Sequence, residues 1–296
     1  MLVMIRIRKI LFPYDLSAAA TAVAPAVSEM ARRFQASVTV LYAFNQIHDY
    51  NLAPIFDGSK WENPGAIPYT PALRALRKED ARCVEEFARA QLPNVEWVTL
   101  VQDGDPASVI EWAANREQAD LIMMSTRSAG RLRRILPGSV ATKIIQSVSC
   151  PVFTSAHAPW SGHETRSGYH SIMTALRLDA ESEKTLKMAA FLGQAYGARL
   201  CLLHVTPPDE PPETAKPVAN LRQFFEQALG AEDAASLETR FRTLNGSVLE
   251  GIRKTALEEA ADLVVVGRGR SQTSFSPSWT HLYTVIRQSP CPVLTV

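Results

Sequence analysis

The sequence predicts an α/β protein built from two tandem domains, each an open parallel sheet with helices between its strands. Three observations support this prediction: the length of the chain, an internal repeat, and a regular alternation of strand and helix patterns. The chain has 296 residues, and a domain holds roughly 100–200, so about two domains are expected. Apolar residues make up 46% and charged residues 21%, which excludes a wholly disordered chain.

The two halves of the chain repeat one pattern in the same order. Residues 10–17 and 172–179 are short apolar runs that lead into helical segments rich in Ala and Glu. Three further matches join residues 36–43 with 198–205, 119–124 with 261–266, and 150–154 with 291–295. Ordered matches of this kind indicate a duplicated domain. We therefore predict one domain over 1–156, a linker over 157–168 and a second domain over 169–296.

Within each copy, short apolar runs alternate with helical patterns. In the first copy the runs are nearly continuous in apolar character, as in strands buried on both faces of a parallel sheet. They include Val38–Leu41, Trp97–Val101 and Leu121–Met124. The helical patterns between them cover Ala20–Phe34, Pro71–Gln91, Pro106–Glu117 and Ser139–Gln146. Asp105 before Pro106, and Ser17 after Asp15, are suitable helix starts.

The composition of the chain also indicates which kinds of binding partner and which cellular compartment to expect. Lys and Arg number 31 against 30 Asp and Glu, so no basic excess suggests a nucleic-acid partner. The four cysteines form no CxxC pair, which fits a reducing compartment. The first apolar run is interrupted by Arg6, Arg8 and Lys9, and no run reaches the ~18 apolar residues of a membrane span. We expect a cytoplasmic protein without a membrane partner.

In open parallel sheets, ligands bind outside the carboxyl ends of the strands, where the strand order reverses. In the first copy, Pro13-Tyr14-Asp15 follows the first strand and Ala43 follows the second. The fourth strand leads into residues 125–140, which combine small residues, four arginines, and Gly138-Ser139 at the start of a helix. Free backbone N–H groups, a helix N-terminus and nearby guanidinium groups favour an anionic ligand.

On these residues the chain resembles a tandem universal stress protein, and the resemblance covers nearly all of both copies. It implies a fold of the adenine-nucleotide alpha-hydrolase-like type. It also implies a pseudo-dimer packed through residues 151–154 and 292–295, in a chain that is monomeric or forms a homodimer. Nucleotide-binding members carry G-x2-G-x9-G-[S/T] after strand four. The residues implied to bind nucleotide are Pro13, Tyr14, Asp15, Ala43, Met124, Ser125, Arg127, Ser128, Gly138, Ser139 and Val140.

Both copies depart from the family motif. The first copy reads S-x2-S-x9-G-S, with Ser125 and Ser128 in place of two glycines. A non-glycine residue forced into the left-handed region costs roughly 1–2 kcal/mol, which weakens binding without abolishing it. In the second copy, Arg177 replaces Asp15 and would place a long cation in the adenosine pocket. Since Thr280-His281 also replaces Gly-Ser there, we expect nucleotide in the first copy alone.

The resulting hypothesis is a stress-response protein that binds ATP or AMP, with Mg²⁺ accompanying the nucleotide, and acts as a nucleotide-responsive regulatory module. Its protein partner is not identified by the sequence. The alternative is an interaction scaffold of the same family that binds no nucleotide. Ser125 and Ser128 favour this alternative, whereas Asp15 and Gly138-Ser139 oppose it. No catalytic base is identifiable, so no enzyme activity is assigned, and slow ATP hydrolysis is left open.

Four other features need an interpretation. Residues 126–130 nearly match a nucleophile elbow, but the first Gly is absent and the duplicated half-size unit argues against an esterase. His157, His163 and His170 are metal-ligand types in what reads as a solvated linker. Residues 45–70 form a long segment with scattered aromatics, which either covers a pocket or lies on the surface. Cys150 and Cys291, each before a Pro, are interpreted as small buried residues.

Overall fold

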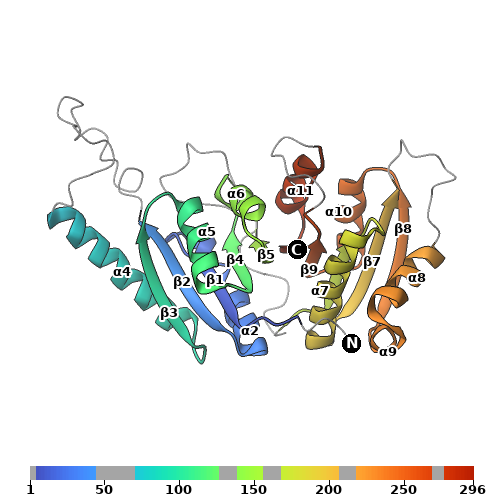
Figure 1. Cartoon of the computed structure of the whole chain (residues 1–296), viewed down its shortest axis with the longest axis horizontal. Coiled ribbons are helices and arrows are strands. Elements are labelled where there is room, and N and C mark those ends of the chain that lie inside the picture. The colour runs from blue at the N-terminus through green and yellow to red at the C-terminus, as the bar shows by residue number, and fades with distance from the viewer. Residues whose placement is uncertain (1–4, 45–70, 127–138, 156–167, 207–217, 269–276) are drawn as a thin grey trace. The chain divides into compact units, whose positions relative to one another are not determined.

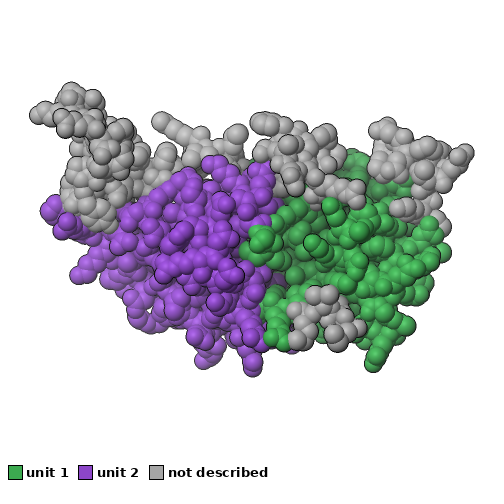
Figure 2. All heavy atoms as spheres, viewed as in Figure 1, with its two compact units in different colours: residues 1–7, 149–296 green, residues 8–148 purple. Residues whose placement is uncertain are grey.

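The computed structural model describes residues 5–44, 71–126, 139–155, 168–206, 218–268 and 277–296 (Figure 1). The chain divides into two compact units, residues 8–148 and residues 1–7 together with 149–296 (Figure 2). Both units contain a mostly parallel sheet with helices between successive strands. The predicted α/β class is confirmed.

In residues 8–148, four parallel strands lie in the order β3-β2-β1-β4. Their bounds are β1 Lys9–Pro13, β2 Ser37–Phe44, β3 Trp97–Asp103 and β4 Leu121–Ser125. The helices described in this unit are α1 Ala18–Thr21, α2 Ala24–Phe34, α4 Pro71–Gln91, α5 Pro106–Glu117 and α6 Ser139–Ser147 (Figure 1).

The other unit holds six strands in the order β5-β10-β9-β6-β7-β8. Their bounds are β5 Val152–Ser155, β6 Ser171–Ala175, β7 Arg199–Thr206, β8 Thr239–Asn245, β9 Leu263–Val266 and β10 Val293–Thr295. The helices are α7 Ala180–Tyr196, α8 Val218–Leu229, α9 Ala231–Ala235, α10 Val248–Glu258 and α11 Pro277–Gln288. All pairs from β10 to β8 are parallel, and β5 pairs antiparallel with β10.

The final strands of the two repeats pair with each other. Leu294 lies opposite Phe153, Val293 lies opposite Thr154, and the Thr154 hydroxyl donates to the Val293 carbonyl over 3.2 Å. The predicted contact between residues 151–154 and 292–295 is therefore confirmed. One consequence is that β5, the last strand of the first repeat, belongs to the compact unit of the second repeat.

Local sequence explains where several helices begin. The Asp105 carboxylate accepts from the Ser108 amide over 3.1 Å, and Pro106 needs no such partner, so α5 begins where predicted. The prediction of one helix over Ala20–Phe34 is wrong, because the segment forms α1 and α2 with a break at residues 22–23. Pro25, the second residue of α2, has no N–H to donate to the preceding turn.

None of the helices in the described ranges is both long and apolar enough to span a bilayer. The predictions on residues 45–70, on His157 and on His163 fall outside the described residues. His170 is described and exposed, and its backbone amide donates to the Asp262 carboxylate over 2.8 Å.

Candidate functional site

The carboxyl edge of the sheet in residues 8–148 brings the described candidate residues together. Strand β1 lies between β2 and β4, so the strand order reverses at β1. Leu11 is in register with Ile122 of β4, and Pro13 is in register with Leu41 of β2. Residues that follow these three parallel strands therefore share one edge, which is the position where such sheets bind ligands.

Asp15 follows β1 at this edge, and its side chain is exposed. The Tyr14 amide donates to the Leu41 carbonyl over 2.8 Å, which holds the chain against β2 just before Asp15. The next residue, Leu16, has a φ of 59°, and the Ser17 amide donates to Asp15 Oδ1 over 3.2 Å. The Ser17 hydroxyl then caps α1. This turn presents the carboxylate at the sheet edge.

The same turn occurs in the second repeat with a different side chain. Leu178 has a φ of 63° and occupies the position of Leu16, so the left-handed turn belongs to the fold and not to one ligand site. Arg177 stands in place of Asp15. Its guanidinium lies 3.0 Å from Asp179 and 3.3 Å from Glu181, over the first turn of α7. The Arg177 guanidinium is thus paired with carboxylates at the start of the helix that follows it. The second repeat has no carboxylate at the position that Asp15 occupies in the first.

Tyr14 uses its side chain for packing. The ring stacks on Phe87 of α4 with 3.7 Å between centroids and 14° between planes, and the hydroxyl lies 3.3 Å from the Thr21 hydroxyl. Burial raises the pKa of the phenol, and the charge of Asp15 adds to the rise, while the bond to Thr21 opposes it. Of the predicted site residues, Tyr14 can therefore contribute its backbone to a ligand, but its ring is buried.

The other described candidates lie at the ends of β1, β2 and β4 and at the start of α6. Ala43 is half-buried near the end of β2, and Met124 and Ser125 end β4, with Met124 buried and Ser125 half-buried. Pro13 ends β1, and Ser139 and Val140 begin α6. Arg127, Ser128 and Gly138 lie outside the described residues, as do the alternative elbow residues from 127 to 130.

Gly267, which matches the first motif glycine in the second repeat, has a packing role. A Cβ on Gly267 would lie 2.9 Å from the Thr185 hydroxyl of α7. In the first repeat, Ser125 corresponds to Gly267, and Val23 corresponds to Thr185. Val23 lies at the break between α1 and α2. The close approach of α7 to the end of β9 thus explains this glycine without a phosphate.

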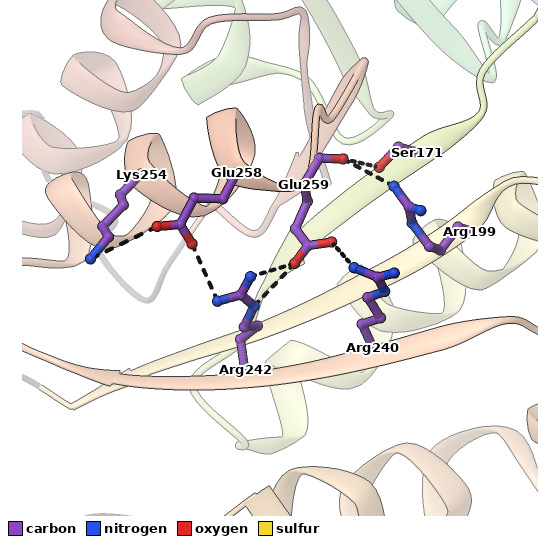
Figure 3. Close-up of polar contacts among 7 residues, drawn as sticks. All are labelled: Ser171, Arg199, Arg240, Arg242, Lys254, Glu258 and Glu259. Carbon is purple, nitrogen blue, oxygen red and sulfur yellow. Dashed lines mark hydrogen bonds and ion pairs between the residues drawn. The ribbon is translucent and has the colours of Figure 1, made fainter.

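A second polar cluster, which the sequence reasoning missed, surrounds Glu259 at the end of α10 (Figure 3). Its side chain is 1% exposed. Arg242 donates to Glu259 Oε1 through Nε over 3.0 Å and Nη2 over 2.6 Å, and Arg240 donates to Oε2 over 3.2 Å. The backbone carbonyl of Glu259 accepts from the Ser171 hydroxyl over 2.9 Å and from Arg199 over 3.1 Å.

The electrostatics of this cluster keep Glu259 charged. Burial would raise the pKa of its carboxyl, but the hydrogen bonds and positive charge of Arg242, with the charges of Arg240 and Arg199, bring it below the ordinary value. The signal available in the sequence was the Arg-x-Arg spacing of Arg240 and Arg242. That spacing puts both side chains on one face of a strand.

A duplicated, mostly parallel α/β fold with polar residues at the strand-order reversal defines the class of this protein. Within that class, the family model described as universal stress protein family matches the chain twice, over residues 6–154 and 168–296. The chain therefore belongs to the universal stress protein family, whose members are stress-response proteins, and it has the tandem two-domain form.

Two curated relatives each match one repeat. A universal stress protein of Thermus aquaticus is 29% identical over 145 residues, which is 49% of this chain and 96% of that protein. One from Methanocaldococcus jannaschii is 32% identical over 145 residues, 49% of this chain and 79% of that protein. Among solved structures, a universal stress protein from Archaeoglobus fulgidus has a TM-score of 0.69 at 22% identity and covers 98% of this chain and 96% of its own.

Proposed function

We propose that this protein binds an adenine nucleotide, ATP or AMP, at the carboxyl edge of β1, β2 and β4 and acts as a nucleotide-responsive module of the stress response. The observation that carries the proposal is the exposed carboxylate of Asp15 at the point where the strand order reverses. Family membership supports it, because nucleotide-binding members place an Asp after the first strand.

The described residues fit the adenosine end of such a ligand. An exposed carboxylate can accept hydrogen bonds from ribose hydroxyls, and the backbone of Ala43 and its neighbours can meet the edge of a base. Ser125, at the end of β4, is small and half-buried, so it admits close approach of a ligand. The helix α6 begins at Ser139, and a helix N-terminus favours phosphate oxygens.

Mg²⁺ would be carried by the nucleotide in this proposal. Across the part of the chain that the structure describes, no group of three or more His, Cys, Asp or Glu side chains is placed to hold a metal ion. Phosphate oxygens are hard ligands that magnesium commonly uses together with water. In this proposal, the phosphates hold the magnesium ion, and Asp15 and the start of α6 bind and orient the nucleotide. No catalytic step is assigned.

The second repeat is proposed to bind no nucleotide in this manner. Arg177 takes the place of the carboxylate and pairs with Asp179 and Glu181, and Gly267 is explained by the approach of Thr185. We also place the protein in the cytoplasm. All four cysteines are free thiols, which suits a reducing compartment.

Isothermal titration calorimetry with ATP and AMP tests this proposal. We expect saturable binding of one nucleotide per chain. Asp15→Ala should weaken it by roughly ten- to hundredfold, the loss expected for hydrogen bonds to a charged group. Arg177→Ala is the matched control at the equivalent position, and it should leave affinity unchanged.

Nucleotide released from the purified, denatured protein gives an independent measurement by chromatography. If neither calorimetry nor release detects adenine nucleotide, the alternative of an interaction scaffold replaces the proposal. Equal losses in Asp15→Ala and Arg177→Ala would contradict the assignment of the site to the first repeat.

A further inference from the structure

The cluster around Glu259 faces solvent with an excess of positive charge. Four cations, Arg199, Arg240, Arg242 and Lys254, surround two carboxylates, Glu258 and Glu259 (Figure 3). The carboxylate of Glu259 is 1% exposed, whereas the side chains of Arg240 and Lys254 are 56% and 68% exposed. The outer surface of the cluster is therefore more basic than its interior.

The buried carboxylate organises the exposed cations. Arg242 already satisfies Glu259 Oε1 with two donors and also pairs with Glu258 over 3.2 Å. Arg240 gives one contact of 3.2 Å to Glu259, and a guanidinium has five donors in a planar fork. An arginine held in place by a buried partner loses less side-chain entropy when it binds an external carboxylate.

The first repeat folds without this cluster. Strand registers place Arg240 opposite Cys201 and Val98 opposite Thr39, so Arg240 and Arg242 correspond to Val98 and Leu100. Arg199 lies opposite Ser171 and Ser37 lies opposite Lys9, so Arg199 corresponds to Ser37. The three arginines are thus not required by the fold, which points to a role specific to the second repeat.

A groove with three leucines (Leu244, Leu249 and Leu257) among mostly polar lining residues continues the basic surface. Arg240, Arg242 and Leu244 alternate along β8 and so share one face of the strand. A cavity of about 780 Å³ is lined by Leu244, Gly251, Lys254, Leu257 and Glu258, among others. Lys254 and Glu258 belong both to the cavity and to the Glu259 cluster, and Leu257 is 58% exposed.

We propose that this surface, the arginine face (Arg199, Arg240, Arg242 and Lys254), docks an extended acidic segment of a partner protein. Carboxylates of such a segment would pair with Arg240 and Lys254, whose side chains are 56% and 68% exposed, while Arg242 stays paired with Glu259 and Glu258. Planar carboxylates match the guanidinium fork. An aliphatic residue of the same segment would lie in the groove beside Leu244 and Leu257. This proposal does not depend on nucleotide binding.

Fluorescence anisotropy with a labelled nonapeptide of alternating Glu and Thr, carrying one Leu near its end, tests the proposal. We expect binding that weakens as salt rises, because the contacts are exposed ion pairs. Arg240→Gln should weaken it about two- to fivefold, the range of an exposed ion pair, and Arg240→Gln with Lys254→Gln should weaken it further. Both side chains are largely exposed, so thermal unfolding should confirm that the variants fold.

Arg222→Gln is the matched control. Arg222 lies over the ring of Phe241, whose side chain points to the opposite face of the same strand, and its loss should leave binding unchanged. Equal weakening by Arg222→Gln would overturn the proposal, because the charge effect would then be general. It would also be overturned if the peptide failed to bind, or if Arg240→Gln reduced only the binding of inorganic phosphate or of phosphatidylserine vesicles.

Discussion

Glu259 holds an ionised carboxylate at a position that solvent does not reach. A buried charge is tolerated only when hydrogen-bonding partners replace its hydration. Arg242 and Arg240 supply those partners from β8, and the backbone carbonyl of Glu259 is bonded by Ser171 and Arg199 from β6 and β7. One residue thus ties the end of α10 to three neighbouring strands.

Glu259→Gln should lower the free energy of unfolding at pH 7 by about 1–3 kcal/mol, the range for hydrogen bonds to charged groups. The native pKa of Glu259 lies below the ordinary 4.5, so its stabilisation is present above that pH and is lost as the pH falls through the native value. Urea unfolding at pH 7 and near pH 3 measures this, and the variant and the original chain should converge in acid.

Glu258→Gln is the control for this prediction, since the Glu258 side chain is 40% exposed and should contribute little. A loss in Glu258→Gln as large as that in Glu259→Gln would show that burial does not set the strength of the cluster. A difference that persisted unchanged at pH 3 would contradict the assigned charge state.

At the scale of elements, the first helical segment differs between the repeats. In the second repeat it is one helix, α7, whereas the first repeat divides it into α1 and α2. Helix α7 approaches the end of β9 closely enough that a Cβ on the exposed Gly267 would crowd the Thr185 hydroxyl. The equivalent position in the first repeat tolerates Ser125.

Gly267→Ala should therefore destabilise the protein by roughly 0.5–1.5 kcal/mol, the cost of moving the Thr185 side chain away from its preferred rotamer. The added Cβ would meet the Thr185 hydroxyl at 2.9 Å, and something must shift. The loss should be smaller in a Thr185→Ala background, which removes the hydroxyl. A double-mutant cycle of thermal unfolding measures the coupling, and additive effects of the two changes would contradict this explanation.

Much of the element order followed from the sequence, for physical reasons. The bounds of α4 and α5 match the predicted ranges, since Pro71, Asp105 and Pro106 mark their starts clearly. Strand β2 extends to Phe44, beyond the predicted Leu41, because β3 continues to pair with it. The break before α2 was missed, since a proline near a helix start and a proline that breaks a helix have the same local pattern.

The candidate site was predictable only in part. The common position of Asp15, Ala43 and Ser125 follows from parallel strands that end at one edge. The direction of the Tyr14 ring does not, because it depends on Phe87 of a helix far along the chain. The Glu259 cluster depends on the register of three strands with one helix end, which no local pattern specifies.

At the scale of the whole molecule, repeats and compact units do not coincide. Strand β5 comes from the first repeat, yet it groups with residues 149–296 and pairs with β10. Strand β5 has only four residues, which is short for an independent strand, and its first three residues are buried. Their stability therefore depends on the second repeat.

Native-state hydrogen exchange of the full chain should show this dependence. The amides of β5 are expected to exchange together with those of β9 and β10, and not with those of β1 and β2. Leu294→Ala removes a side chain that is 1% exposed and should lower protection across β5, β10 and β9 by about 2–5 kcal/mol. Exchange of β5 in step with β1, unaffected by Leu294→Ala, would contradict the prediction.

The antiparallel pair of β5 and β10 has a consequence for any attempt to divide this gene. A fragment that stops after residue 155 would keep β5 but lose its antiparallel partner β10, and a fragment that begins at residue 168 would keep β10 but lose β5. A strand whose backbone N–H and C=O groups are left unpaired at an exposed edge tends to pair with a strand of another chain. Separately produced halves should therefore recombine with each other or self-associate, so each repeat is best studied within the intact polypeptide.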